Sequence, residues 1–273
     1  MTPNGADPTG GLLVVKLGGT TLAEQRQTLT DVAELSARQS VVVVHGGGRR
    51  LTEWLERLGI ETGFAGGLRV TDDQSLEVAA AVLGGLVNSE LVATLRQRGA
   101  DAVGLTGIDG GLLAGQRRSE LGRVVTVRGG RPAVVLSLLS GGFVPVVAPL
   151  ALDEQGVICN VNADDAAAAL AASLHARLVL LTDTDGVRDD VDQTIRHLDE
   201  ARAEQLIASG VIGAGMVPKV RSALRVLHAG ATEVVIADGR QESAVKRALD
   251  DQGFGTHFRL GAGGAAEAFE ERA

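Results

Sequence analysis

Two lysines at opposite ends of the chain lie beside glycine-rich segments of the kind that hold phosphate groups. Lys16 ends an apolar run and is followed closely by Gly18-Gly19, and Lys219 follows the run Gly213–Pro218 and opens a helical pattern. A third glycine segment, Gly46-Gly47-Gly48, comes after another apolar run. In the succession of strand, glycine turn and helix, backbone N–H groups bind a polyphosphate and a lysine supplies a mobile charge. The pattern predicts a protein that transfers a phosphoryl group.

A second group of polar residues precedes an alanine-rich helix. Asn160 and Asn162 stand at alternate positions before Asp164, which opens that helix. The two amides can hold a substrate through donor and acceptor groups, and the aspartate can cap the helix or hold two lysines in place. Arg69, in a glycine-containing loop, is a candidate for bidentate recognition of a carboxylate. His45 ends a strand, and because the sequence shows no partner that would orient it, we expect a structural role.

The segment Thr182–Val187 leads from an apolar run into acidic and polar residues. Ligands of open α/β sheets bind at the carboxyl ends of strands, so these side chains can contact a nucleotide or its magnesium ion. The chain has neither the P-loop sequence nor the glycine fingerprint of dinucleotide-binding proteins. No group of residues has the spacing of a protein-only metal site, so we expect any Mg²⁺ to arrive with the nucleotide.

The composition is that of an enzyme with an aliphatic core. Of the 273 residues, 45% are hydrophobic but only 2% are aromatic, so the core must consist of Ala, Val, Leu and Ile. The net charge of −8 argues against a nucleic-acid-binding face. The single cysteine, Cys159, excludes an internal disulfide and a multi-cysteine metal site. No apolar run approaches ~18 residues and the first residues lack a signal-peptide pattern, so we expect a cytoplasmic protein without a transmembrane helix.

Apolar runs alternate with helical patterns along most of the chain. This alternation predicts an α/β fold, a three-layer αβα sandwich with an open, mainly parallel central sheet. The predicted strands are Leu12–Leu17, Val41–His45, Ala102–Leu105, Val124–Val127, Ala133–Leu136, Val144–Ala148, Leu178–Thr182 and Glu233–Ala237. The predicted helices are Leu22–Ser36, Leu51–Leu58, Asp72–Arg98, Asp164–Leu174, Ala201–Ser209, Pro218–Ala229 and Ala244–Asp251. Gly122–Val127 and Ala133–Val135 are expected to form an antiparallel insertion.

The chain divides into two predicted lobes that share one sheet, because no linker separates them. The first lobe covers residues 12–177 and the second covers residues 178–261. Residues 1–11 are expected to be a flexible leader, and residues 262–273 a loose tail without an amphipathic pattern.

Taken in order, seven motifs of this chain resemble those of the amino acid kinase family, and within it the kinases of N-acetylglutamate. They are Lys16–Gly19, Val44–Gly48, Gly67–Thr71, Asn160–Asp164, Leu181–Asp183, Gly215–Lys219 and Asp238–Arg240. Each motif is modest alone, but their order and spacing cover nearly the whole chain.

The resemblance implies that the γ-phosphoryl group of MgATP is transferred to the side-chain carboxylate of N-acetyl-L-glutamate, giving an acyl phosphate. This is the second step of arginine biosynthesis. The first lobe would bind the acceptor and form the dimer, and the second would bind ATP. A loose phosphoryl-transfer transition state needs alignment and charge stabilisation, and a carboxylate acceptor is already ionised at neutral pH. The absence of a catalytic histidine or cysteine agrees with this chemistry.

The resemblance also implies a role for each matched residue. Lys16 and Lys219 would be catalytic by stabilising charge on the transferring group, and Asp164 would orient both lysines. The backbone of the glycines would bind the phosphoryl group and the acceptor: Gly18, Gly19, Gly46, Gly47 and Gly48. Arg69, Asn160 and Asn162 would bind the acceptor. The ATP pocket would be lined by Asp183, Thr184, Asp185, Gly186, Val187, Arg188, Val211, Ile212 and Gly213.

The resemblance extends to assembly. Arginine-inhibited members of the family carry an extra N-terminal helix, whereas the leader of this chain is short and rich in proline and glycine. We therefore expect a homodimer with little inhibition by arginine and no regulatory partner of the PII type. The apolar helix Asp72–Arg98 is the expected dimer contact.

Two other readings stay open at this stage. One is a sister kinase of aminoadipate or glutamate linked to a carrier protein, since Val103–Gly110 occurs in similar form in both groups. Arg117-Arg118 could supply its basic docking rim, although Gly67–Asp72 favours the acetylglutamate enzyme. The other is a catalytically silent nucleotide-binding subunit on the same fold. The presence of both lysines and of Asp164 argues against that reading.

Overall fold

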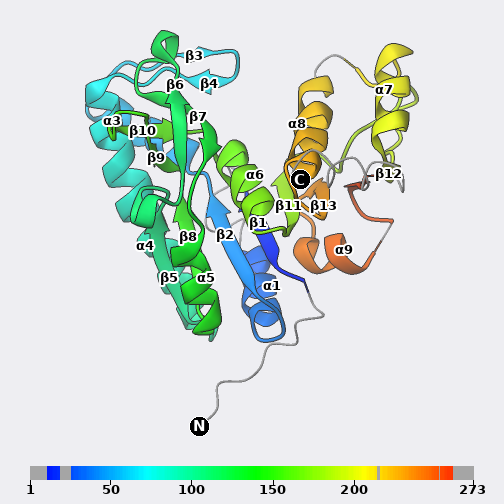
Figure 1. Cartoon of the computed structure of the whole chain (residues 1–273), viewed down its shortest axis with the longest axis horizontal. Helices are drawn as coiled ribbons and strands as arrows, with labels where there is room; N and C mark the ends of the chain where they lie inside the picture. Colours follow the sequence, from blue (N-terminus) through cyan, green and yellow to red (C-terminus); the bar gives the residue numbers. More distant parts are fainter. Residues whose placement is uncertain (1–10, 19–25, 214–215, 252, 261–273) are drawn as a thin grey trace, which may run out of the picture.

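An eight-stranded sheet runs through the whole molecule in the computed structural model, which describes residues 11–18, 26–213, 216–251 and 253–260 (Figure 1). In spatial order its strands are β12 (His197–Leu198), β14 (Thr256–Phe258), β13 (Glu233–Asp238), β11 (Arg177–Thr182), β1 (Leu13–Leu17), β2 (Val41–His45), β8 (Val144–Ala148) and β5 (Ala102–Thr106). All neighbouring strands are parallel except β13 and β14. The predicted open and mainly parallel sheet is therefore confirmed.

Helices cover both faces of this sheet, and the strand residues alternate between the two cores. Val14 and Val42 belong to one core cluster, and Val15 and Val43 belong to the other. The first cluster packs against α5 (Ala133–Ser140), α6 (Ala163–Ser173), α7 (Glu200–Ala208) and α8 (Val217–His228). The second packs against α1 (Arg26–Ser36), α4 (Asn88–Gln97) and α9 (Ala244–Asp250). Near-continuous valine runs form the central strands because both faces are buried. The predicted αβα sandwich is confirmed.

The predicted antiparallel insertion is wrong in its second half. β7 (Val124–Gly129) is a strand, but it belongs to a small closed barrel with β6 (Ala114–Arg117), β9 (Leu150–Leu152) and β10 (Ile158–Val161). The predicted strand Ala133–Leu136 lies in helix α5, directly after Pro132. An apolar run this short does not distinguish a strand from a buried helix by its periodicity, and proline is common at the start of helices. Within this run only Val135 is fully buried, because the run's four residues form one turn of a helix and a single side chain faces the core.

A long apolar helical stretch flanks the sheet beside the edge strand β5. It runs through α3 (Asp73–Ala79), the π-helix η1 (Ala80–Val87) and α4. By length and composition alone the 25 residues Asp73–Gln97 could cross a membrane, which the sequence analysis did not anticipate. Leu83, Leu91 and Leu95 pack into the protein cores, which is how one face of a core helix behaves.

The remaining elements surround the carboxyl end of β2. Helix α2 (Gly48–Arg57) follows that strand, and a two-stranded hairpin is formed by β3 (Phe64–Ala65) and β4 (Leu68–Arg69). Two 3₁₀ turns, η2 (Asp109–Gly111) and η3 (Ser119–Leu121), flank β6. Strands of both predicted lobes share the one sheet, since β1 pairs with β11. The division at residue 177 stays a prediction.

Candidate active site

An ion pair joins the end of β1 to the start of α6. The Nζ atom of Lys16 lies 2.7 Å from Oδ1 of Asp164, with 12% of the lysine side chain exposed and 50% of the aspartate side chain. Asn162 precedes α6, and its Oδ1 accepts hydrogen bonds from the backbone N–H groups of Asp164 (2.8 Å) and Asp165 (3.3 Å). Because Asn162 caps the helix, the carboxylate of Asp164 stays available for the lysine. The structure brings together these two predicted catalytic residues.

Lys219, on helix α8, lines the same cavity as Lys16. The cavity holds about 350 Å³ and lies at the carboxyl ends of β1 and β11. Its lining consists of Lys16, Leu17, Gly18, Thr28, Arg49, Asp164, Leu181, Thr182, Asp183, Lys219 and Gly239. Lys219 stands in the first turn of α8, three residues after the described chain resumes at Met216. Two lysines and the aspartate that pairs with Lys16 therefore line one space, which we call the phosphate cavity.

The glycines after β1 and β2 allow close approach of backbone to this site. A Cβ atom on Gly18 would lie 2.8 Å from the carbonyl oxygen of Leu181, so only glycine fits between β1 and β11. Gly47 has φ +118° and precedes α2, and its Cβ would meet Leu83 at 2.8 Å. Gly19 lies outside the described residues. The backbone therefore runs close to the neighbouring elements at both turns, and a side chain at either position would collide with them.

His45 is a buried neutral residue that fixes the second glycine turn. Its Nδ1–H donates to the carbonyl oxygen of Gly46 at 2.8 Å, so its Nε2 must accept from Nδ2 of Asn88 at 3.2 Å. The other hydrogen of this NH₂ group is shared between the carbonyl oxygens of Val146 (2.9 Å) and Leu105 (3.2 Å). Burial lowers the pKa of His45 to about 4. The structural role predicted for His45 thus has its partner in Asn88, which sequence reasoning missed because it lies 43 residues away.

A second cavity of about 340 Å³, which we call the acceptor cavity, is lined by the hairpin, the start of α2 and the segment before α6. Its lining includes the predicted residues Gly46, Gly48, Arg69, Asn160 and Asn162. Arg69 is only 8% exposed, and its guanidinium donates to Oγ1 of Thr62 (2.9 Å), to Oγ1 of Thr52 (2.6 Å) and to the carbonyl oxygen of Gly48 (3.2 Å). Burial lowers the pKa of Arg69, yet no carboxylate in the described chain pairs with it.

The acceptor cavity therefore contains a buried guanidinium held by neutral groups. Asn160 also lines it, and its Nδ2 donates to Oγ1 of Thr71 at 3.3 Å, so its carbonyl oxygen is left for a ligand donor. The ring of Phe64 lies under the Arg69 guanidinium, with 4.7 Å between the Cζ atom and the ring centroid. A cation, amides and backbone N–H groups in one cavity suit a small molecule with a carboxylate and an amide.

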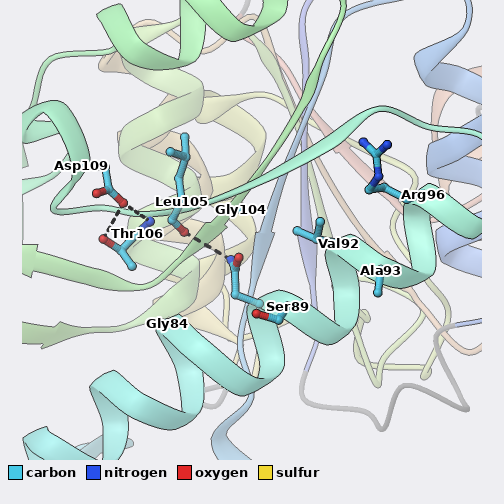
Figure 2. A pocket seen from close by; sticks show the side chains of 10 residues that line it. Gly84, Ser89, Val92, Ala93, Arg96, Gly104, Leu105, Thr106 and Asp109 are labelled. Atoms are coloured by element: carbon cyan, nitrogen blue, oxygen red, sulfur yellow. Dashed lines mark hydrogen bonds between the residues drawn. The ribbon is translucent and has the colours of Figure 1, made fainter.

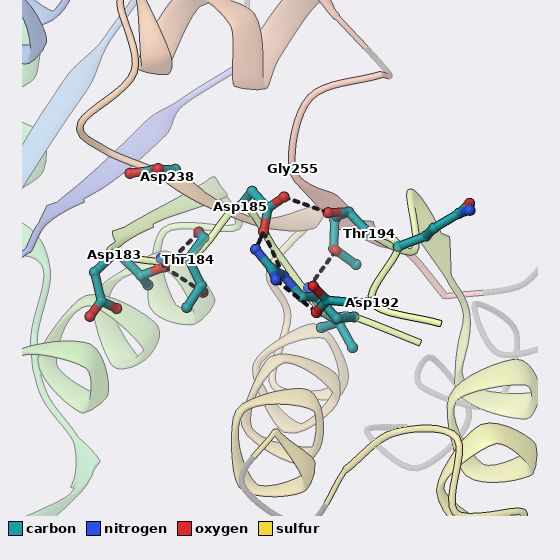
Figure 3. A network of polar contacts seen from close by, with 12 residues as sticks. Asp183, Thr184, Asp185, Asp192, Thr194, Asp238 and Gly255 are labelled. Atoms are coloured by element: carbon teal, nitrogen blue, oxygen red, sulfur yellow. Dashed lines mark hydrogen bonds and ion pairs between the residues drawn. The ribbon is translucent and has the colours of Figure 1, made fainter. Parts of the chain in front are cut away.

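The residues predicted to line the ATP pocket, 183–188 and 211–213, lie mostly outside the lining of the phosphate cavity. Of these nine residues, Asp183 alone is among those that line the phosphate cavity. Figure 3 shows Asp185 and Asp192 in one polar network with Thr194, in which Arg188 bonds both aspartates (3.1 and 2.7 Å).

Two predicted nucleotide contacts have buried side chains. Val187 is 0% exposed and Ile212 is 2% exposed, so neither side chain can contact a nucleotide. The backbone of Val187 is also paired, because its N–H donates to Oγ1 of Thr256 and its carbonyl oxygen accepts from the N–H of Ile195, both at 2.8 Å. Arg240, whose motif the sequence analysis quoted without a role, donates to the carbonyl oxygen of Asp183 at 2.7 Å. It also bonds both carboxylate oxygens of Asp238 at 2.9 Å, and this lowers the pKa of that aspartate. The end of β13 therefore holds the end of β11 in place.

The described residues contain no group of three or more His, Cys, Asp or Glu side chains that could hold a metal ion. Within the phosphate cavity the carboxylates are Asp164, which is paired with Lys16, and Asp183. Sequence reasoning also missed three polar residues that line the two cavities, Thr28, Arg49 and Thr52. Arg49 directly follows the predicted glycine segment, and its charge there was the available signal.

The chain is similar to one protein family and to several known proteins. The family model described as "Amino acid kinase family" matches residues 11–238. An acetylglutamate kinase from Gloeobacter violaceus is 41% identical over 90% of this chain and 86% of its own length. One from Solibacter usitatus is 45% identical over 89% of this chain and 97% of its own. The solved structure of smu.665 from Streptococcus mutans has a TM-score of 0.72 at 29% identity, over 83% of this chain and 94% of that one. The chain belongs to the amino acid kinase family.

Proposed function

We propose that this chain is an ATP-dependent kinase of N-acetyl-L-glutamate, which forms N-acetyl-L-glutamyl 5-phosphate in arginine biosynthesis. Relatives at 41–45% identity over about nine-tenths of the chain are acetylglutamate kinases. The observation that carries the proposal is the adjacency of two cavities with different chemistry. One contains Lys16, Asp164 and Lys219, and the other contains the buried Arg69 with the amide of Asn160.

The acceptor is bound by its α-carboxylate and its acetamido group. Arg69 attracts the carboxylate with its positive charge and the N–H donors that Thr52, Thr62 and Gly48 leave unused, and Asn160 meets the amide. The backbone N–H groups at Gly47 and Gly48 meet the side-chain carboxylate that receives the phosphoryl group. Held in this way, the acceptor oxygen points to the phosphate cavity, and its alignment supplies much of the rate enhancement.

Lys16 and Lys219 stabilise the charge that moves from the γ-phosphoryl group to the bridging oxygen. The Lys16 ammonium is held by Asp164 before substrates arrive, so it costs no reorganisation during the reaction. Mg²⁺ enters with ATP, held mainly by the phosphates and water, and neutralises phosphate charge when bound. Among the described residues that line that cavity, Asp183 is the carboxylate without an ion pair, and it would be available to the ion or its water shell.

The test is a hydroxylamine-trapping assay with MgATP, in which an acyl phosphate becomes a coloured hydroxamate. N-Acetylglutamate, free glutamate, aspartate and aminoadipate are offered in parallel, with ADP release measured separately. Hydroxamate with N-acetylglutamate alone supports the proposal. ATP binding without ADP release with any acceptor would instead support a silent subunit.

The carrier-protein alternative has less support from the structure. Of its predicted docking rim, Arg117 lies 3.6 Å from Asp153 and donates to the carbonyl oxygen of Gly122, and Arg118 pairs with Glu120 at 2.8 Å. Both arginines are thus already paired within the chain. Turnover of a carrier-linked substrate, without turnover of N-acetylglutamate, would favour this alternative.

We further propose a cytoplasmic homodimer in which the face of the Asp73–Gln97 stretch turned away from the cores meets a second copy. Of the 18 most apolar consecutive residues in this stretch, only 39% are buried within the chain. Beside it, a hollow of about 500 Å³ lies between α4 and the edge strand β5, with Gly84, Ser89 and Val92 on one side and Thr106 on the other (Figure 2). Sedimentation analysis of the wild type and of Ala93→Glu, at an exposed position of the same hollow, tests this contact. That no PII-type regulator binds stays a prediction.

A further inference from the structure

Arg49 lies where the two cavities meet. It lines the acceptor cavity together with Gly48, and it lines the phosphate cavity together with Lys16 and Lys219. Among the described residues that line either cavity, none other lines both. Transfer requires the acceptor oxygen and the γ-phosphorus to approach in line. Under the proposed function, on which this inference rests, the reacting atoms therefore meet beside Arg49.

The charge environment of Arg49 is unfavourable in the free protein. It stands in the first turn of α2, where the helix dipole disfavours a positive charge. Its neighbour Arg50 has carboxylate partners, Glu53 at 3.8 Å and Glu90 at 3.5 Å. Arg49 has no such ion pair with any residue that the structure describes. An unpaired cation at the positive end of a helix gains most from an anionic ligand.

We propose that Arg49 contacts the phosphoryl group during its transfer, as a third cation beside Lys16 and Lys219. In the reaction the bond from the γ-phosphorus to the bridging oxygen breaks, and ADP leaves with the electron pair. A carboxylate oxygen of the acceptor forms the new bond to phosphorus. The guanidinium offers two N–H donors to the equatorial oxygens, over which the transition-state charge is spread.

The kinetic test compares Arg49→Gln with the adjacent control Arg50→Gln. We expect the Arg49 variant to lose about 10- to 100-fold in kcat, less than for a fully enclosed donor because this side chain is exposed. KM for N-acetylglutamate should change little, and the control should stay within about twofold of wild type. Thermal stability of Arg49→Gln should be equal or higher, since a charge opposed by the helix dipole is removed. A parallel loss of stability and of activity would show a structural role and overturn the proposal.

A binding measurement keeps this result separate from the proposed function. Calorimetry compares MgADP with the magnesium complex of the non-hydrolysable ATP analogue AMP-PNP, without any acceptor. Arg49→Gln should weaken the analogue several-fold and leave MgADP unchanged, whereas Arg50→Gln should change neither. One outcome is a wild type that forms no hydroxamate with N-acetylglutamate, while Arg49→Gln still weakens AMP-PNP binding and not MgADP binding. In that case the acceptor assignment is wrong, but the contact of Arg49 with the γ-phosphoryl group stands. Equal effects of both variants on both ligands would contradict the role of Arg49.

Discussion

The acceptor side and the nucleotide side of the site differ in how they are built. The acceptor cavity has polar side chains on regular elements, among them the buried Arg69 at the end of β4 and the half-buried Asn160 in β10. On the nucleotide side, the predicted residues lie mainly in the loop after β11, where Arg188 and Asp185 bond each other and Val187 is buried. The predicted acceptor residues thus present side chains to a cavity, whereas several of the predicted nucleotide residues are bonded to one another or buried.

The largest effect on turnover is expected from Lys219, because the phosphoryl group that passes between the two substrates is stabilised there. Lys219→Ala should lower kcat by about 10²- to 10³-fold, because a preorganised cation is removed from the developing charge. KM for the acceptor should change little. Arg221→Ala, on the same helix and 3.8 Å from Glu204, is the matched control in steady-state kinetics. Near-normal turnover of the Lys219 variant would refute its catalytic role.

The next effect should be confined to the acceptor side. Arg69→Lys should raise KM for N-acetylglutamate by about 10- to 100-fold, because an ammonium cannot replace the guanidinium donors at a charged hydrogen-bonded contact. KM for ATP should stay unchanged. Arg57→Lys provides a control, since Arg57 also lies over an aromatic ring, that of Trp54 at 5.6 Å. An equal rise in KM for N-acetylglutamate and in KM for ATP would mean that the acceptor side and the nucleotide side do not bind their substrates independently.

A smaller effect is expected on the nucleotide side. Arg240→Gln should raise KM for ATP by about 3- to 10-fold, since the loss of its bond to the Asp183 carbonyl oxygen loosens the end of β11. KM for the acceptor should not change. Arg247→Gln, whose side chain lies over Phe254 away from the cavity, is the control. An unchanged KM for ATP would show that Asp183 needs no such support.

The smallest effect concerns stability and follows from His45. Its folded-state pKa of about 4 lies below the ordinary 6.5, so the unfolded chain binds a proton more readily between these values. His45 therefore contributes fully above pH 6.5, and its contribution falls as the pH drops towards 4. His45→Asn keeps a donor near Gly46 but does not titrate. Urea unfolding at both pH values should show a shallower decline for the variant, and identical declines would contradict the assignment.

Regular patterns explain what the sequence could reveal. The central strands were predictable because valine runs such as Val41–Val44 are typical of strands buried on both faces. Lys16 and Lys219 were predictable because each stands beside a glycine-rich segment. The helix at Ala133–Ser140 was not, since its short apolar run has no clear period. Asn88 and Arg49 were missed because only the fold brings Asn88 to His45, and only the cavities show what Arg49 faces.

The most direct test of the two-cavity account is a crystal structure with the magnesium complex of AMP-PNP and N-acetylglutamate. The account predicts the γ-phosphoryl group among Lys16, Lys219 and Arg49, and the α-carboxylate of the acceptor against Arg69. The side-chain carboxylate of the acceptor should face the phosphorus in line. An acceptor bound outside the cavity of Arg69 and Asn160, or a nucleotide whose phosphates avoid both lysines, would contradict it.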